Sequence, residues 1–476
     1  MAKLLFIQDI QYEFLGPIYI SAMLKSHGHD CKVVIGKTFK TFEKVIEEYK
    51  PDIVGFSIMS GSAQWASEIG LQIKNKYGLH TIYGGVHPTF FPEYINNEGV
   101  DIIVRGEGED AALDVMNCID NKQDFGKIGN ITYKKNGKII ENEIRDLNPD
   151  LDAYPFPDRK LYETELQKYN VDLSVRNVIT SRGCPFNCAF CQVVIMRKLY
   201  KGKGIFLRTR KAEKVVEELE LLKKTTQTKT LYFVDEFFGS DYNWFKDFLP
   251  QYKQRIGLEY SCLVRADIIK KNKDYTRLLK DSGCRMVAFG IESGSESIRN
   301  ELLNKKIKNE DILYAASMLH KENLKFRAYN IVGFPGENLL DAYETVKLNI
   351  DIKTDYPWCY IFQPLKDTAL ANYAIKNKEL PYDFFCEINK RSFFSGSPIQ
   401  TKDIKKIINL QKFFQTAVLW PRTFPLIKLL IKIPPNPVFN LWFGFVFYIV
   451  YTKSEGRNWW KTFLFAIKNY SLTSKK

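Results

Sequence analysis

Residues 181–191 read Ser181-Arg182-Gly183-Cys184-Pro185-Phe186-Asn187-Cys188-Ala189-Phe190-Cys191. Three cysteines therefore lie at C-x3-C-x2-C spacing on one loop, where their thiolates can converge on a single metal centre. Structural zinc takes four ligands, and no neighbouring Cys or His supplies the fourth at a suitable spacing. A cubic iron–sulfur cluster also normally takes four thiolates, so a cluster held by three keeps one iron open to another ligand. Three buried structural thiols are a weaker interpretation, because buried cysteines have no reason to follow this spacing beside Gly and Pro.

The segment around this loop alternates short apolar strands with helical stretches. Six strands are predicted, at 177–181, 230–234, 259–263, 286–291, 325–331 and 359–363. The cysteine loop directly follows the first of them. Six repeats are too few for a closed eight-stranded barrel, so we expect a partial (β/α)6 barrel with its chemistry at the carboxyl ends of the strands.

The N-terminal part of the chain shows the same alternation of strands and helices. Its strands are predicted at 4–7, 31–35, 52–56, 81–83 and 101–104. This rhythm is typical of a Rossmann-like, doubly wound parallel sheet, which binds ligands beyond the carboxyl ends of its strands. A purely structural role for such a domain stays open on periodicity alone. A hairpin at 130–141 and a Pro-rich linker follow it.

The cysteine loop resembles the signature of the radical S-adenosylmethionine (SAM) enzymes, C-x3-C-x-aromatic-C, with Phe190 as the aromatic residue. The resemblance implies that Cys184, Cys188 and Cys191 bind a [4Fe-4S] cluster whose open iron chelates SAM and cleaves it to a radical. Later strand ends also match the family. They place Glu292 and Ser293 near the ribose or amino acid part of SAM, and the backbone at Gly333 near its adenine. Together with Phe190 these are the predicted SAM-binding residues.

The first domain resembles the cobalamin-binding domain of one large branch of that family. The residues that carry this resemblance follow the third and fourth strands: Ser57, Met59, Gly84, Gly85 and His87. A small hydroxyl and a glycine pair let the backbone approach the nucleotide tail of the corrin closely. The loop 9–14, where related domains carry a histidine ligand to cobalt, has no histidine. We therefore expect cobalamin to bind without a histidine lower ligand.

These patterns together predict an α/β chain in four parts. They are a Rossmann-like cobalamin-binding domain with its hairpin at 1–145, a linker at 146–172, a radical SAM core at 173–395 and a basic, aromatic helical region at 396–476.

Charge and composition separate the last part from the rest. The chain carries a net charge of +14, of which residues 401–476 hold 13 Lys or Arg and 2 Asp or Glu, or +11. The largely apolar run 438–451 is shorter than the roughly 20 residues that span a bilayer. Two interpretations stay open, namely a helical cap packed on the barrel and peripheral contact with the inner face of the membrane. Nucleic acid is not expected as a partner, since no binding module is recognisable.

The predicted function is that of a cytoplasmic radical SAM enzyme that uses the cluster and cobalamin to modify an unactivated carbon, with methyl transfer favoured. Nine cysteines, an odd number, and the absence of a recognisable secretory signal favour a reducing compartment. Expected partners are a small-molecule or lipid-like substrate and an electron donor such as flavodoxin or ferredoxin. The alternatives are a non-methylating radical SAM oxidoreductase or cyclase, and a non-catalytic membrane-associated iron–sulfur protein. No catalytic acid or base is assigned.

Overall fold

The computed structural model describes residues 1–385, 394, 396–457, 459–460 and 462–463. The chain divides into two compact units. The first unit comprises Met1–Val175, Met196–Thr228 and Phe385, and the second comprises Arg176–Ile195, Lys229–Phe384 and the described residues from 394 onward. The domain boundaries given above stay predictions, and the boundary at residue 395 lies outside the described residues.

The first unit is built on one seven-stranded sheet in the order β2-β1-β3-β4-β5-β6-β7. Its strands are β1 (Lys3–Gln8), β2 (Asp30–Ile35), β3 (Ile53–Ser57), β4 (His80–Gly84), β5 (Ile102–Val104), β6 (Ile131–Lys135) and β7 (Lys138–Glu141). The strands β1 to β5 are parallel, and β6 and β7 form the predicted antiparallel hairpin. The predicted doubly wound α/β sheet is therefore confirmed, with a hairpin on one edge.

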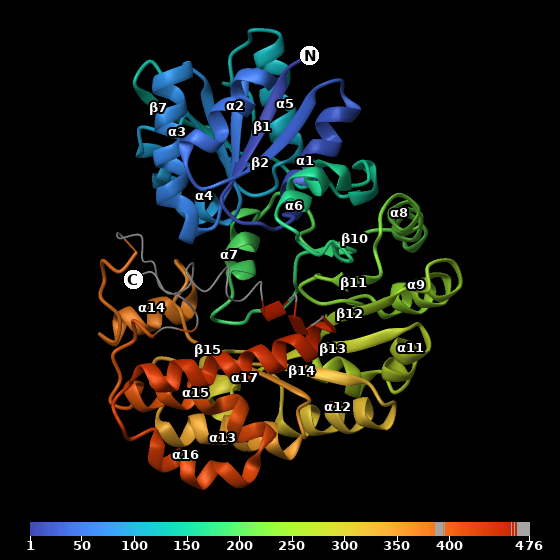
Figure 1. The fold of residues 1–476 in the computed structure, drawn as a ribbon, viewed down its shortest axis with the longest axis vertical. Helices are drawn as coiled ribbons and strands as arrows, with labels where there is room; N and C mark the ends of the chain where they lie inside the picture. The colour runs from blue at the N-terminus through green and yellow to red at the C-terminus, as the bar shows by residue number, and fades with distance from the viewer. Residues whose placement is uncertain (386–393, 395, 458, 461, 464–476) are drawn as a thin grey trace. The chain divides into compact units, whose positions relative to one another are not determined.

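Helices cover both faces of this sheet (Figure 1). They are α1 (Leu15–Ser26), α2 (Phe39–Tyr49), α3 (Ala63–Tyr77), α4 (Val86–Phe90), α5 (Glu109–Asp120) and α6 (Glu163–Lys168), while α8 (Ala212–Thr225) also belongs to this unit but lies away from the sheet. Along β1, Leu4 and Phe6 pack into one core, whereas Leu5 and Ile7 pack into another. Successive side chains of a strand point to opposite faces, so a continuous apolar run fills both cores.

The second unit contains a six-stranded sheet in the order β15-β14-β13-β12-β11-β8. The strands are β8 (Val175–Val178), β11 (Thr230–Phe233), β12 (Glu259–Val264), β13 (Cys284–Glu292), β14 (Lys325–Val332) and β15 (Tyr356–Ile361). The pairs from β11 to β15 are parallel. Each predicted barrel strand has its counterpart here, and the open order with β8 and β15 at the edges confirms a partial barrel of six strands.

Helices follow the strands of this sheet in turn (Figure 1). They are α9 (Tyr242–Arg255), α10 (Ala266–Lys271), α11 (Tyr275–Asp281), α12 (Asn309–Lys321), α13 (Leu339–Asp351) and α14 (Ala369–Lys376), while the shorter elements β9 (Ser181–Arg182), α7 (Gln192–Leu199) and β10 (Arg208–Thr209) lie between β8 and α8 in the sequence.

The C-terminal helices α15 (Ile404–Leu419), α16 (Phe424–Leu430) and α17 (Pro437–Glu455) pack on the second unit (Figure 1). On the edge strand β15, the carbonyl oxygens of Cys359 and Pro357 accept hydrogen bonds of 3.0 Å from Gln411 and Gln415 of α15. A helix that covers an edge strand in this way satisfies backbone groups that would otherwise stay unpaired. The C-terminal region is thus a helical cap on the sheet.

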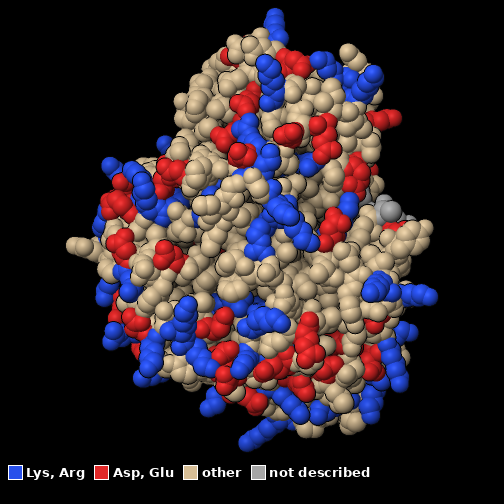
Figure 2. All heavy atoms as spheres, turned by 180° about the vertical axis from the view of Figure 1, so that it is seen from behind, with Lys and Arg blue, Asp and Glu red and all other residues tan. Residues whose placement is uncertain are grey.

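None of the described helices combines the length and the apolar character needed to cross a membrane. On the face drawn in Figure 2, Lys and Arg side chains are interspersed with Asp and Glu. The net charge of +14 therefore does not form a continuous field of one sign on that face.

Candidate functional site

The cysteine loop follows β8 and β9 and is bound to later parts of the second unit by its backbone. Ala189, between the second and third cysteines, donates its N–H to the carbonyl of Leu303 at 2.9 Å. Its own carbonyl accepts the N–H of Leu370 at 2.9 Å. The carbonyl of Asn187 accepts a 2.9 Å hydrogen bond from the Asn304 side chain. The loop is therefore positioned on both sides before any metal binds.

Cys184, Cys188 and Cys191 are half-buried cysteines in this loop and form no disulfide bond. Burial raises the pKa of Cys191 to about 11, and the nearby Cys188, Cys184 and Glu292 add to the rise. Burial also raises the pKa of Cys184, again with a contribution from Cys188. The three sulfur atoms are thus close enough to interact electrostatically, and a bound metal must displace their protons.

The donor set fits a cluster better than a single ion. Residues 181–191 offer three thiols and no fourth Cys, His, Asp or Glu. Structural zinc takes four ligands, whereas a cubic cluster held by three thiolates keeps one iron open to another ligand. Cys184, Cys188 and Cys191 are the residues that would hold such a cluster.

Asp235 anchors the chain just before the cysteine loop. It follows β11 and is fully buried, and its Oδ1 accepts hydrogen bonds from the backbone N–H and the hydroxyl of both Thr180 and Ser181, at 2.6–2.9 Å. Its Oδ2 has no hydrogen-bond partner among the described residues. Burial raises the pKa of this carboxyl, against the lowering effect of those donors. Asp235, just after β11, therefore holds the segment after β8 at Thr180 and Ser181. Ser181 is three residues before Cys184 in the sequence.

Arg265 contacts the same loop through a ring. Its guanidinium lies 3.4 Å from the centroid of the Phe186 ring, between the first two cysteines. Its Nε and Nη2 donate to the carboxylate of Asp267 at 3.0 and 3.1 Å, and Nη2 also donates to the carbonyl oxygen of Lys305 at 3.2 Å. This arginine acts as a support for the loop through cation–π and ionic contacts.

Glu292 ends β13 in a strained conformation. Its φ of 64° is left-handed, and the register of β13 against β14 shifts between Gly290 and Glu292. A buried ion pair of 2.7 Å joins its Oε1 to the ammonium of Lys305. Such bulges and left-handed residues often re-aim a side chain at a functional site. Lys305, its ion-pair partner, accepts a hydrogen bond from Arg265, which stacks on Phe186 of the cysteine loop, so Glu292 is linked to that loop through two residues.

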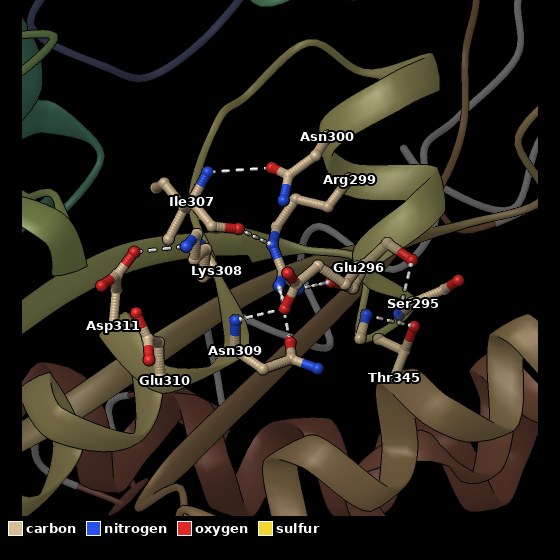
Figure 3. A network of polar contacts seen from close by, with 12 residues as sticks. Ser295, Glu296, Arg299, Asn300, Ile307, Lys308, Asn309, Glu310, Asp311 and Thr345 are labelled. Atoms are coloured by element: carbon tan, nitrogen blue, oxygen red, sulfur yellow. Dashed lines mark hydrogen bonds and ion pairs between the residues drawn. The ribbon is translucent and has the colours of Figure 1, made fainter.

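Arg299 holds the turn that contains Ser293, and Figure 3 shows its network. The side chain is fully buried and donates to the carbonyls of Ser293 and Ile307 at 2.6 and 2.7 Å. It also binds the side chain of Asn309, while Glu296 lies 3.7 Å away. Ser293 itself is fully buried. Arg299 therefore holds the turn after β13 in place through buried hydrogen bonds.

We expect Arg299→Ala to destabilise the second unit by about 3–5 kcal/mol, because it leaves several buried acceptors and Glu296 without their cation. Chemical denaturation followed by circular dichroism measures the change. Lys306→Ala, at an exposed position, serves as the control and should change stability by less than about 0.5 kcal/mol. A loss for Arg299→Ala no larger than the control's would contradict the assigned role.

Gly333 is a backbone corner after β14. Its φ is 82°, and a Cβ there would lie 3.1 Å from Ile404 of α15. Its N–H and that of Phe334 donate to Glu337 Oε2, a fully buried carboxyl whose pKa burial raises to about 8. The N–H of Gly333 is thus already used, so a contact with adenine would involve its carbonyl or neighbouring backbone.

The predicted cobalamin residues lie at the carboxyl ends of β3 and β4. A Cβ added to Gly84 would meet no atom within 4 Å, so the end of β4 is open. Gly85 is different, because its φ is 99° and a Cβ there would lie 2.8 Å from the carbonyl oxygen of Ile58. Ser57 ends β3, and Met59 is 47 % exposed just beyond it.

His87 is a packed residue rather than an open one. It is buried, its Nδ1 is 3.0 Å from the hydroxyl of Ser60, and its ring stacks on Phe91 with 4.7 Å between centroids. Tyr94 meets the same ring edge-on. His87 therefore shapes the loop beyond β4, and a direct contact with a cofactor stays a prediction.

Apolar side chains are exposed at the carboxyl ends of the strands of this sheet. Four large ones are at least 36 % exposed after β1, β3 and β4: Ile10, Tyr12, Met59 and Val86. Exposed apolar groups that gather at the ligand-binding edge of a parallel sheet favour a large, partly apolar ligand there. Together with the open position at Gly84, this rim fits a corrin, and the loop 9–14 offers no histidine to its metal.

Sequence reasoning missed the residues that position this site. Lys305 and Arg299 touch the predicted SAM segment but carry no motif of their own. Arg265 likewise carries no motif, and it stacks on Phe186 beside Asp267. Asp235 did carry a signal, because residues 234–237 directly follow a buried strand and match the family there, but its hydrogen bonds to Thr180 and Ser181 were not predicted.

Two family models match this chain. Residues 178–348 match the radical SAM superfamily, and residues 12–116 match the B12 binding domain. Among curated proteins, the uncharacterized methyltransferase PH0819 of Pyrococcus horikoshii is 31 % identical over 375 residues, which cover 77 % of this chain and 79 % of the relative. The anaerobic magnesium-protoporphyrin IX monomethyl ester cyclase of Rubrivivax gelatinosus is 28 % identical over 374 residues, or 73 % and 65 % of the two chains.

Solved structures show the same fold. The cobalamin-dependent SAM radical enzyme OxsB with aqua-cobalamin bound has a TM-score of 0.70 at 17 % identity, over 99 % of this chain and 76 % of that one. The radical SAM methyltransferase TsrM of Kitasatospora setae, with cobalamin and a [4Fe-4S] cluster bound, has a TM-score of 0.64 at 16 % identity, over 79 % and 78 % of the two chains.

Proposed function

This chain belongs to the cobalamin-dependent radical SAM enzymes, and from that premise we propose that it transfers a methyl group from SAM to an unactivated carbon of a small-molecule or lipid-like substrate. The observation that carries the proposal is the presence of both cofactor sites in one chain. The second unit has a three-cysteine loop, and the first unit has open space at Gly84 after β4 and no histidine in the loop 9–14.

The two cofactors supply the chemistry when bound: the cluster cleaves SAM to a radical, and cobalamin carries the methyl group. The chain's own residues hold and orient them. Cys184, Cys188 and Cys191 bind the cluster, Phe190 lies within its loop, and the turn at Glu292 and Ser293, fixed by Lys305 and Arg299, contacts SAM. At the other site the cobalamin contacts are Ser57, Met59, Gly84, Gly85 and His87.

A non-methylating cyclase or oxidoreductase is the second candidate, favoured by the likeness to the ester cyclase of Rubrivivax gelatinosus. It predicts a different set of products from SAM. Methyl transfer leaves S-adenosylhomocysteine beside 5′-deoxyadenosine, whereas a cyclase that uses only the radical leaves 5′-deoxyadenosine alone.

Product analysis separates these functions. The full chain, reconstituted without oxygen with cluster and cobalamin, is reduced chemically or by flavodoxin or ferredoxin, the donors that we propose for the cell. We expect both S-adenosylhomocysteine and 5′-deoxyadenosine, and the first should disappear when cobalamin is left out. Formation of 5′-deoxyadenosine without S-adenosylhomocysteine would support the second candidate. If neither product forms, the result would support a non-catalytic iron–sulfur protein.

We also propose that the C-terminal helices contact an anionic membrane surface. Among the described residues of 420–463, eleven large apolar side chains are at least 40 % exposed: Trp420, Leu426, Leu429, Ile433, Val438, Leu441, Trp442, Phe445, Trp459, Trp460 and Phe463. The only carboxylate in residues 404–463, that of Glu455, pairs with the buried Arg327. Exposed aromatic and aliphatic groups among cations are what an interfacial segment needs.

Charge placed on α17 tests this contact. We expect Leu441→Glu/Phe445→Glu to weaken binding to vesicles of phosphatidylcholine and phosphatidylglycerol (3:1) by about tenfold or more, because two apolar groups are lost and two negative charges added. Co-sedimentation at low and high salt measures it. Leu340→Glu, at a 72 % exposed position of α13, is the matched control and should bind as the wild type does. If the double variant binds the vesicles as tightly as the wild type does, the proposed membrane contact is wrong.

A further inference from the structure

The cysteine loop reaches the molecular surface between its first two cysteines. Pro185 and Asn187 are exposed, whereas Cys184, Phe186 and Cys188 are half-buried. Exposed and half-buried residues thus alternate along this stretch, and one side of the loop faces solvent. Both cysteines are sequence neighbours of an exposed residue, so an electron that arrives from another protein has a short route to them at this side.

The loop 303–308 borders the exposed side of the cysteine loop. The side-chain amide of Asn304 donates to the carbonyl oxygen of Asn187 at 2.9 Å, which joins the two loops directly. Further along the same loop, Lys306 and Lys308 are both exposed. We name the surface that these two loops form the lysine rim: Pro185, Asn187, Asn304, Lys306 and Lys308.

The two cations of the lysine rim have no acidic partner within the part of the chain that the structure describes. The ammonium of Lys306 donates only to the backbone carbonyl of Asn300, at 3.2 Å. Asp311 accepts the backbone N–H of Lys308 at 3.0 Å, but its carboxylate forms its ion pair with Lys270, at 2.7 Å. Both lysines are therefore available to a negatively charged partner.

The acids of the neighbouring segments lie outside the lysine rim. Exposed ones are Glu236 after β11, Asp367 before α14 and Glu301, which accepts a hydrogen bond from the Ser297 hydroxyl at 3.2 Å. The rim itself contains two cations and no acid. A partner with acidic groups would therefore be oriented toward the loop 303–308 rather than toward the other borders of the cysteine loop.

The lysines of the rim are carried by a well-fixed backbone. The N–H of Ile307 donates to the side chain of Asn300 at 2.9 Å, and its carbonyl accepts from the buried Arg299 at 2.7 Å (Figure 3). The N–H of Lys305 donates to the carbonyl of Arg299 at 3.0 Å. A surface that is ordered before binding loses little conformational entropy when a partner docks.

Reductive cleavage of SAM consumes one electron, which an external donor supplies. We propose that the lysine rim is the docking surface for an acidic protein that carries single electrons, of the flavodoxin or ferredoxin kind. The carrier is oxidised by one electron, the carbon–sulfur bond of SAM breaks, and no atom passes between the two proteins. Electron-transfer complexes are small and transient, so a few complementary charges suffice. This inference rests on the proposed function, because it names the partner of the same site.

Charge reversal tests the inference. We expect Lys306→Glu/Lys308→Glu in the cluster-loaded full chain to weaken the binding of flavodoxin by about tenfold or more at low salt, because attraction becomes repulsion. The difference should shrink at high salt, which screens exposed charges. Surface plasmon resonance with oxidised flavodoxin measures the affinity. Formation of 5′-deoxyadenosine driven by reduced flavodoxin should fall in parallel, whereas formation driven by dithionite, a small reductant, should match the wild type.

Lys321→Glu makes the same charge change at the other end of α12. Lys321 is exposed at the last residue of this helix, which begins directly after Lys308, so about 20 Å of helix separates it from the rim. This variant should bind flavodoxin as the wild type does. Lys306→Gln/Lys308→Gln, which removes the two charges and adds none, should have an intermediate effect and covers a failure of the reversed variant to fold.

The results separate the docking surface from the chemistry. Absence of saturable flavodoxin binding, equal binding by the wild type and both double variants, an equal loss in Lys321→Glu, or an equal loss of the dithionite-driven reaction would overturn the proposal. Binding that depends on the two lysines, without 5′-deoxyadenosine from either reductant, would count against the proposed function alone. Flavodoxin-driven SAM cleavage that is insensitive to the two lysines would count against the docking surface alone.

Discussion

Cys188→Ala is expected to abolish the iron–sulfur absorbance of the reconstituted protein and with it the cleavage of SAM. A cluster held by three thiolates has no spare protein ligand to replace a lost one, because one iron must stay open to SAM. With two ligands the cluster has two uncovered irons and is not retained. Iron content, absorbance near 400 nm and 5′-deoxyadenosine formation measure the effect, which should exceed a hundredfold in activity.

Cys118→Ala is the matched control. Cys118 lies on α5 in the first unit and is also a half-buried free thiol, so its loss tests for a general effect of removing a cysteine. Cluster content and activity should match the wild type. A Cys188→Ala protein with a full cluster and normal SAM cleavage would show that the loop 184–191 is not the cluster site.

Gly84→Phe is expected to expel cobalamin while the cluster stays in place. The position at the end of β4 is open, with no atom within 4 Å of an added Cβ, and its φ is not left-handed. A ring there can be accommodated by the fold but occupies the space that the cofactor needs. Overpacking of this kind costs about 1–3 kcal/mol or more, so the cobalamin content after gel filtration should fall by roughly tenfold or more.

Gly444→Phe, at another open glycine on α17 in the second unit, is the control and should keep both cofactors. Gly85 is less suitable for this test, because a side chain there would strike the Ile58 carbonyl and disturb the fold itself. If Gly84→Phe binds cobalamin as fully as the wild type, the corrin lies elsewhere. A nitrogen signature on cobalt from His87 would contradict the absence of a histidine ligand.

Local patterns were sufficient to predict both sheets. The strands of the second unit follow their predicted positions to within a few residues, as at 230–234 for β11 and 325–331 for β14. Apolar runs of four to eight residues between helical stretches are strong signals, because a parallel strand buried on both faces must be apolar throughout. The cysteine spacing was equally informative, since all three ligands lie on one loop of the chain.

The sequence by itself determined the two α/β sheets, the cysteine loop and the glycine pair Gly84-Gly85 after β4, because each depends on residues that are neighbours along the chain. Only the tertiary structure decided that Arg299 supports the turn at Ser293, that Asp235 holds the end of β8, and that Arg327 pairs with Glu455 of the C-terminal helix. These contacts join residues between 6 and 128 positions apart. Periodicity and motif spacing describe one segment at a time, whereas a buried charge finds its partner only when packing brings distant segments together.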